Sequence, residues 1–161
     1  MKKSRVITGL AIFSLSFFLL GYFRSYVFLY LNARASLIYY HEPYTALPPV
    51  LSMFESFDYG KLLTSKWILT FLFTFLFGTL SVLSIFFAFR QKKYTILTIV
   101  VYALIFIASL LSIMVGRFYP SLYSHCFEIS RGLEHFQQSP MIAIILLLSI
   151  YYFRQMPVKE Q

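Results

Sequence analysis

WILTFLFTFLFGTLSVLSIFFAF (residues 67–89) and YTILTIVVYALIFIASLLSIMV (residues 94–115) are uncharged runs, and together they decide the fold of this chain. The basic tetrapeptide RQKK (residues 90–93) separates them. As helices, runs of this length would extend about 33 to 35 Å, enough to cross the hydrocarbon core of a bilayer. Because a helix satisfies its own backbone polar groups in lipid, the two runs predict an antiparallel pair of transmembrane helices joined by a tight turn.

Two further apolar runs flank this pair, Val6–Phe23 near the start and Pro140–Phe153 near the end. The last run gives only about 21 Å of helix, so we expect the span to begin at Ser139-Pro140 and to reach Met156. The hydrophobic content of 59% and the mean hydropathy of +0.72 exceed values typical of soluble domains. The sequence therefore predicts an all-α integral membrane protein, one transmembrane domain over residues 1–161. Its four expected spans are residues 6–23, 67–89, 94–115 and 140–156.

The first run has the basic start of a signal peptide, and Ala33-Arg34-Ala35 resembles a cleavage motif. However, the run is longer than usual for a signal peptide and the motif lies ten residues beyond it, so we expect a retained anchor. Apolar residues continue at helical spacing past the run, and Pro43 would end such a helix. Whether this helix extends beyond the bilayer is left open.

Two longer outer loops are expected, one after the first span and one at Gly116–Ser139. Within the first, Val50–Leu63 mixes apolar and charged residues and is interpreted as a short helix on the outer surface. Glu55 and Asp58 are three residues apart in it, a spacing that a pair of catalytic acids could use. Solvated acids on a surface helix are the simpler explanation.

Charge predicts the orientation. With four spans, both termini and the turn at residues 90–93 share one side, which carries eight basic residues and one acidic residue. The other side carries six basic and five acidic residues. Cytoplasmic segments are enriched in Lys and Arg, so we expect both termini and the turn to be cytoplasmic. The net charge of +8 then reflects topology and contact with anionic lipid headgroups rather than nucleic acid.

Small residues recur at steps of three or four on the second and third spans. Such spacing lets helix backbones approach closely in lipid, although small residues are also simply common in membrane helices. The predicted helix-packing positions are Gly78, Ser81, Ala108, Ser112 and Gly116.

Cys126 is the single cysteine, and with His125 and Arg131 it forms the one residue set suggestive of cysteine acyl transfer. Adjacent residues diverge by about 100° on a helix, and no nucleophile motif surrounds Cys126. The wide separation of His125 from His135, without a second cysteine, does not match usual metal-ligand spacing. We therefore predict no catalytic residues, no cofactor and no metal. The apolar runs also lack an ionisable residue near the middle, which counts against a transporter or channel acting alone.

The order of features resembles the small membrane proteins encoded beside bacterial exosortases, the exosortase F- or X-system-associated family. The similar features are a basic N-terminal anchor, the stretch Phe54–Tyr59, a Lys/Trp-led second helix, the turn at residues 90–93 and a closing run that ends Tyr151-Tyr152-Phe153-Arg154. Exosortases are polytopic cysteine transpeptidases of protein sorting, and this chain is similar to their companions rather than to the enzyme. The resemblance transfers no functional residues.

The resemblance implies a non-enzymatic accessory protein of the bacterial inner membrane that packs against a larger polytopic partner, such as an exosortase. The alternatives are a membrane enzyme that uses Cys126, His125 and Arg131, and a small transporter or channel subunit. The sequence does not distinguish the partner, the substrate or the oligomeric state.

Overall fold

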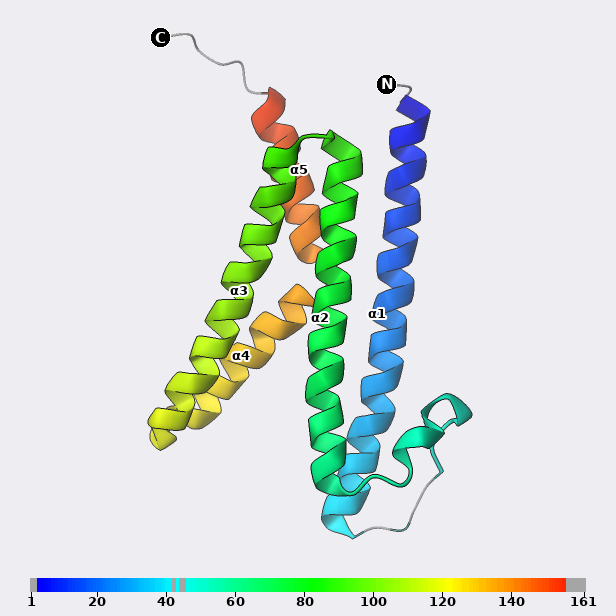
Figure 1. Cartoon of the computed structure of the whole chain (residues 1–161), viewed down its shortest axis with the longest axis vertical. Coiled ribbons are helices and arrows are strands. Elements are labelled where there is room, and N and C mark those ends of the chain that lie inside the picture. The colour runs from blue at the N-terminus through cyan, green and yellow to red at the C-terminus, as the bar shows by residue number, and fades with distance from the viewer. Residues whose placement is uncertain (1–2, 42, 44–45, 156–161) are drawn as a thin grey trace. The chain divides into compact units, whose positions relative to one another are not determined.

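The computed structural model describes residues 3–41, 43 and 46–155, and side chains for residues 11–41, 43 and 46–153. These residues are almost entirely helical and contain no strand, so the all-α class is confirmed (Figure 1). Met156, where the fourth span was expected to end, lies outside the described residues. The helices are α1 (Lys3–Tyr40), η1 (Pro49–Phe54), α2 (Tyr59–Phe89), α3 (Lys92–Phe118), η2 (Pro120–Leu122), α4 (Tyr123–Gln137) and α5 (Met141–Gln155).

Three helices are long and apolar enough to cross a membrane, namely α2, α3 and the part of α1 from Ala11 to Tyr40. A fourth crossing exists if η2 with α4, and then α5, form one bent passage, because the two arms meet at 62°. The chain is thus a membrane-like helical protein with three or four candidate spans.

Helix α1 continues well past Phe23, the expected end of the first span, and stops at Tyr40. His41 then takes a left-handed backbone conformation with φ of 56°, and Pro43 follows in the sequence. Helix α2 ends in the same manner, because Arg90 has φ of 52° and its N–H bonds the carbonyl of Phe86 at 2.8 Å. A left-handed residue after the last helical turn is a common way to end a helix. Arg90 and Gln91 alone connect α2 to α3.

The surface helix expected at Val50–Leu63 is not a single element. Residues 49–54 form the 3-10 helix η1, while Tyr59 already begins α2, eight residues before Trp67. The cause is local: an Asp58 Oδ1 accepts the backbone N–H of Lys61 at 2.8 Å and so caps the helix. Together with the burial of Leu62, this cap lets α2 begin before its uncharged run.

The expected outer loop at Gly116–Ser139 is also corrected by the structure. It contains η2 and the 15-residue helix α4, which packs along α3. Helix α4 has one polar face and one mixed face. A search for uncharged apolar runs does not detect such a helix, but the pattern is typical of a helix that has one side covered by protein.

The chain divides into two units. Unit 1 comprises the residues up to Phe17 together with those from Thr74 onward, and unit 2 comprises Phe18–Phe73. In unit 1, α3 runs the length of the unit, α4 runs obliquely beside its C-terminal half, and α5 continues toward the Arg90–Gln91 turn (Figure 1). The start of α1, this turn and the end of α5 lie at the same end of unit 1 (Figure 1).

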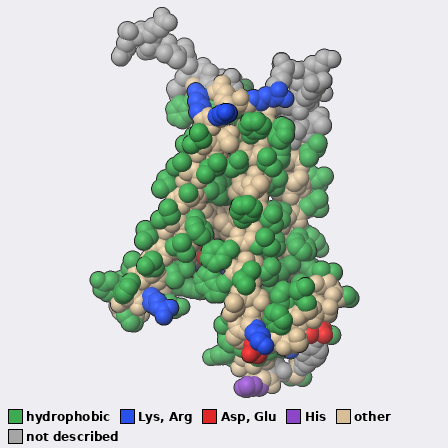
Figure 2. All heavy atoms as spheres, viewed as in Figure 1, with side chains coloured by type: hydrophobic (Ala, Val, Ile, Leu, Met, Phe, Trp, Pro, Cys, Tyr) green, Lys and Arg blue, Asp and Glu red, His purple; other side chains and the backbone are tan. Residues whose placement is uncertain are grey.

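The described surface of unit 1 is mainly apolar along its length. Figure 2 shows Lys and Arg side chains at the end of the unit that holds the α2–α3 turn, with hydrophobic side chains below them. Arg90, Lys92 and Lys93 are the exposed basic residues of that turn. Lipid rather than water suits such a surface, because exposed apolar patches of this extent are rare on soluble proteins.

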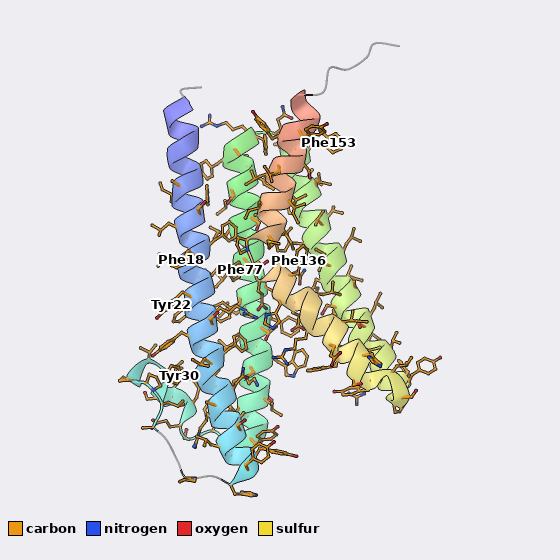
Figure 3. The ribbon with its side chains drawn as sticks, turned by 180° about the vertical axis from the view of Figure 1, so that it is seen from behind. Phe18, Tyr22, Tyr30, Phe77, Phe136 and Phe153 are labelled. Atoms are coloured by element: carbon orange, nitrogen blue, oxygen red, sulfur yellow. The ribbon has the colours of Figure 1, made fainter. Side chains whose placement is uncertain are left out.

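Unit 2 has an apolar core built from the second part of α1, the segment around η1 and the first part of α2. Its buried members are Val27, Leu31, Ala35, Leu47, Leu51, Leu62 and Phe73. Aromatic side chains also project from α1, as Tyr22 and Tyr30 show (Figure 3). Tyr22 is 68% exposed.

Candidate functional site

The contact between α3 and α4 is a ladder of small and polar residues. Ser109 and Ser130 share a hydrogen bond with their hydroxyl oxygens 2.7 Å apart, and Ser112 Oγ donates to the Cys126 carbonyl at 2.8 Å. Further along, Gln137 Nε2 donates to the backbone carbonyl of Tyr102 at 2.7 Å. The residue number rises on α4 as it falls on α3, so the ladder is antiparallel.

Gly116 sits at the end of this ladder nearest the α3–η2 connection. A Cβ added to it would lie 2.9 Å from Cys126 Cβ and 3.3 Å from Tyr123 Cα. Real Cβ atoms do not come so close, so the absence of a side chain at Gly116 is what allows α4 to pack this near. The helix-packing position therefore serves contact within the chain.

Of the other predicted packing positions, two lie in the contact between α2 and α3 and one lies on an open surface. Ser81 is fully buried, and its hydroxyl is 2.7 Å from the Tyr102 hydroxyl, which joins α2 to α3. Gly78 lies beneath the same tyrosine ring, and a Cβ added to it would be 3.4 Å from Tyr102 Cδ1. Ala108 is exposed on α3 and contributes to neither contact.

Three residues of the suggested cysteine chemistry lie on α4, but the helix separates them. Cys126 is half-buried and faces the Gly116 side, whereas His125 and Arg131 are exposed. A helix places adjacent side chains about 100° apart, so the thiol and the His125 imidazole point in different directions. Among the described residues, no three His, Cys, Asp or Glu side chains gather in a group able to hold a metal ion.

The exposed side of α4 carries a polar stripe. Its members recur at steps of three and four, opposite the side that carries Cys126, Ser130 and Gln137. The α4 stripe consists of His125, Glu128, Arg131 and His135, all exposed.

The α4 stripe extends deep into the unit. The hydrogen bond between Ser109 and Ser130 places the neighbouring Arg131 close to Ser109. Ser109 lies nine residues before Phe118, the last residue of α3, which is about 13 Å from that end of the helix. Gln137 reaches Tyr102, which is only ten residues from Lys92, the start of α3. The stripe thus leads from the C-terminal end of α3 toward its middle.

The acids of the first outer segment have structural roles. Glu55 Oε1 accepts the backbone N–H of Leu47 at 3.1 Å, and the Glu55 carbonyl accepts Arg34 Nη2 at 3.2 Å. Asp58 caps α2, as described above. Each carboxylate therefore helps to fix the backbone of unit 2.

Sequence reasoning missed the polar residues at the end of α4 and immediately after it. Gln137 and Gln138 are buried, 1% and 5% exposed, and Gln138 Nε2 donates to Thr74 Oγ1 on α2 at 2.8 Å. Figure 3 labels their neighbour Phe136 at the end of α4 and Phe77 on α2 at a similar height. The signal that could have found Gln137 is the helical spacing of Cys126, Ser130 and Gln137 within a segment whose polarity favours a loop.

Comparison with family models, with curated proteins and with solved structures finds no match to this chain.

Proposed function

We propose that the chain is a non-enzymatic accessory subunit of a bacterial inner-membrane protein-sorting or processing system. In this proposal the α4 stripe packs against a larger polytopic partner, an exosortase-like protein, and both termini face the cytoplasm. The observation that carries the proposal is the depth of the exposed, charged stripe along α3.

Charged side chains at this depth are unfavourable against lipid. Insertion scales assign about 2.5 to 3.5 kcal/mol to Arg, Lys or Asp at the centre of a transmembrane helix. Glu128 and Arg131 are exposed in the isolated chain. A second membrane protein with complementary polar groups would remove this cost, and such polar groups within membranes commonly face protein interiors.

The accessory role is favoured over the enzyme by the surroundings of the thiol. Cys126 belongs to the packed α3–α4 contact, where its carbonyl accepts a hydrogen bond from Ser112. A cysteine nucleophile needs an accessible, activated thiolate beside its base. His125 lies on the exposed side and does not provide that arrangement.

Site-specific photocrosslinking in the native host tests the partner. We expect a photoreactive residue at Glu128 or Arg131 to give an adduct with the same polytopic membrane protein, identified by mass spectrometry. The matched control is Leu104, 60% exposed on the apolar surface of α3. The proposal would be contradicted if Glu128 and Arg131 gave only adducts with lipid, in the same yield as Leu104.

Two further measurements separate the accessory subunit from the enzyme and establish its orientation. Deletion of the gene should impair sorting of envelope proteins, and a Cys126→Ala chain should restore it. A Cys126→Ala chain that accumulates normally but behaves like the deletion would favour the enzyme. Reporter fusions that are active only in the cytoplasm should work after Lys93 and after Gln161, and should be inactive after Tyr119.

A further inference from the structure

The α4–α5 break (Gln138–Pro140) is the one interruption within the bent passage of unit 1. Pro140 lacks a backbone N–H, and Ser139 supports both sides of the break. Its hydroxyl donates to the Phe136 carbonyl at 2.8 Å and accepts the N–H of Met141 at 3.3 Å. A helix break in lipid is tolerated only where other groups form hydrogen bonds with the backbone N–H and C=O groups that the break frees. The groups around this break therefore indicate how its backbone is satisfied.

The break lies at mid-depth in unit 1. Gln138 bonds Thr74, which is the middle residue of α2, and Gln137 bonds the carbonyl of Tyr102. Tyr102 is about 15 Å from the start of α3, a helix about 40 Å long. Two independent contacts, to α2 and to α3, thus place the break far from both ends of the helices.

One hydrogen-bond acceptor beside the break has no partner within the part of the chain that the structure describes. Gln137 is 1% exposed, and its Oε1 atom is buried without a hydrogen bond among the described residues. The orientation of the amide is fixed, because the reverse orientation would place Oε1 2.7 Å from the Tyr102 carbonyl oxygen. A buried acceptor without a donor typically costs about 1 to 3 kcal/mol, so a donor is strongly favoured here.

Backbone donors are also present at the break. The first helical hydrogen bond of α5 is donated by Ile144 to the Pro140 carbonyl. The N–H groups of Ile142 and Ala143 precede it, and both residues are buried. The first N–H groups of any helix lack partners within the helix. The break therefore combines an unpaired side-chain acceptor with the buried residues of a helix start, and a ligand that both donates and accepts hydrogen bonds suits this combination.

We propose that the α4–α5 break is a binding site for ordered water, anchored by Gln137 Oε1. Water donates to Oε1 and accepts from the first turn of α5, and buried waters usually make two to four such bonds. The site is internal to the chain, so it depends neither on the partner nor on the accessory role proposed above. The membrane passage then contains a hydrated point near its middle.

Water-edited solid-state NMR of the purified full chain in lipid bilayers tests this proposal. Labelling Gln and Ala places reporters at Gln137 and Ala143, with assignments from single substitutions. The control for Ala143, which is 1% exposed, is Ala108, which is exposed on the apolar surface of α3. Gln91, in the α2–α3 turn, is the hydrated reference.

We expect the Gln137 side-chain carbonyl and Ala143 to receive magnetisation from water several-fold faster than Ala108, at rates near that of Gln91. Transfer to both as slow as to Ala108 would overturn the proposal. In a Gln137→Met chain, which keeps the side-chain length but removes the acceptor, transfer to Ala143 should fall to the Ala108 rate. Unchanged transfer in a folded Gln137→Met chain would exclude Gln137 as the anchor; if that variant fails to fold, the comparison within the native chain still decides.

Discussion

The interiors of the two units are made of different residues. In unit 2 the buried core is apolar throughout and includes Leu31 and Leu62, both fully buried. The interior of unit 1 contains polar as well as apolar side chains. Every buried polar residue among the described ones lies in this unit. These are Ser81, Ser84, Thr98, Ser109, Ser130, Gln137 and Gln138.

The free energy gained by burying a side chain depends on what that side chain would contact if it were not buried. Where water is the alternative, burying an apolar side chain is favourable by about 25 cal/mol for each Å² removed from water. Where lipid is the alternative, an apolar side chain gains little, and association depends on close packing and hydrogen bonds. Unit 1 has the interior expected for helices in lipid, and unit 2 has an interior resembling that of a soluble protein.

The connection between α1 and α2 supports this distinction. The Glu55 carboxylate accepts the N–H of Leu47, and Arg34 donates to the Glu55 carbonyl, so polar groups secure the segment that covers the core of unit 2. Leu47 and Leu51 are themselves buried. A segment held in this way covers the apolar core of unit 2.

The largest effect is expected from removing a core side chain of unit 2. Leu62→Ala should destabilise the protein by about 3 kcal/mol, because it loses apolar burial and leaves a cavity. The control is Leu72→Ala on the same helix, where the side chain is 48% exposed and the cost should stay below about 1 kcal/mol. Unfolding by SDS in mixed micelles, followed by circular dichroism, measures both. Equal costs would show that the core of unit 2 is not specially stabilised.

In unit 1 the largest effect is expected at Gly116, where packing rather than burial is limiting. Gly116→Ala forces Cβ atoms of two helices together and should cost about 1 to 2 kcal/mol. Gly132→Ala on α4 is the matched control, because an added Cβ there meets nothing within 4 Å. It should stabilise the helix by up to about 1 kcal/mol through helix propensity. The same SDS titration should therefore give shifts of opposite sign, and shifts of the same sign would contradict the close α3–α4 contact.

A smaller effect is expected at the start of α2. Asp58→Ala removes the cap on the Lys61 N–H and should cost about 1 kcal/mol, whereas Asp58→Asn keeps a capping oxygen and should cost little. Hydrogen exchange of the Lys61 and Leu62 amides should be several-fold faster in the alanine variant only. Similar exchange in both variants would mean that α2 does not depend on this cap.

The sequence predicted the parts of the fold that depend on charge and hydropathy alone. The all-helical class and the pairing of α2 with α3 through a very short connection follow from two uncharged runs and a basic turn. The start of α2 at Tyr59 could not be found in this way, because a capped helix can continue through charged residues such as Lys61 and Lys66. Hydropathy indicates which residues suit a lipid environment, but it does not indicate where a helix begins or ends.

The candidate site could be predicted only in part for a similar reason. The small residues of α3 are visible in the sequence because they interrupt an apolar run. Their partners on α4 are not, because that segment is polar overall and its composition favours a loop. Gln137 and Gln138 bond residues 35 and 64 positions away, and no local pattern in the sequence reports such separations.

The smallest effect, and the most direct test of the comparison, concerns the Ser109–Ser130 hydrogen bond. Their hydroxyl oxygens are 2.7 Å apart in the buried α3–α4 contact. Hydrogen bonds between membrane helices contribute on average about 0.6 kcal/mol and at most about 1.7 kcal/mol, because the separated helices also find partners. A double-mutant cycle with Ser109→Ala and Ser130→Ala should give a coupling free energy in this range in the SDS titration.

Ser124, exposed on α4, provides the control cycle with Ser109, and the coupling there should be zero within error. A coupling between Ser109 and Ser130 near zero would leave close packing at Gly116 as the main determinant of the α3–α4 contact. A coupling as large as the cost of Leu62→Ala would remove the energetic difference between the units. Because the Ser109–Ser130 bond replaces bonds that the separated helices would also make, we expect it to specify the register of α4 more than its stability.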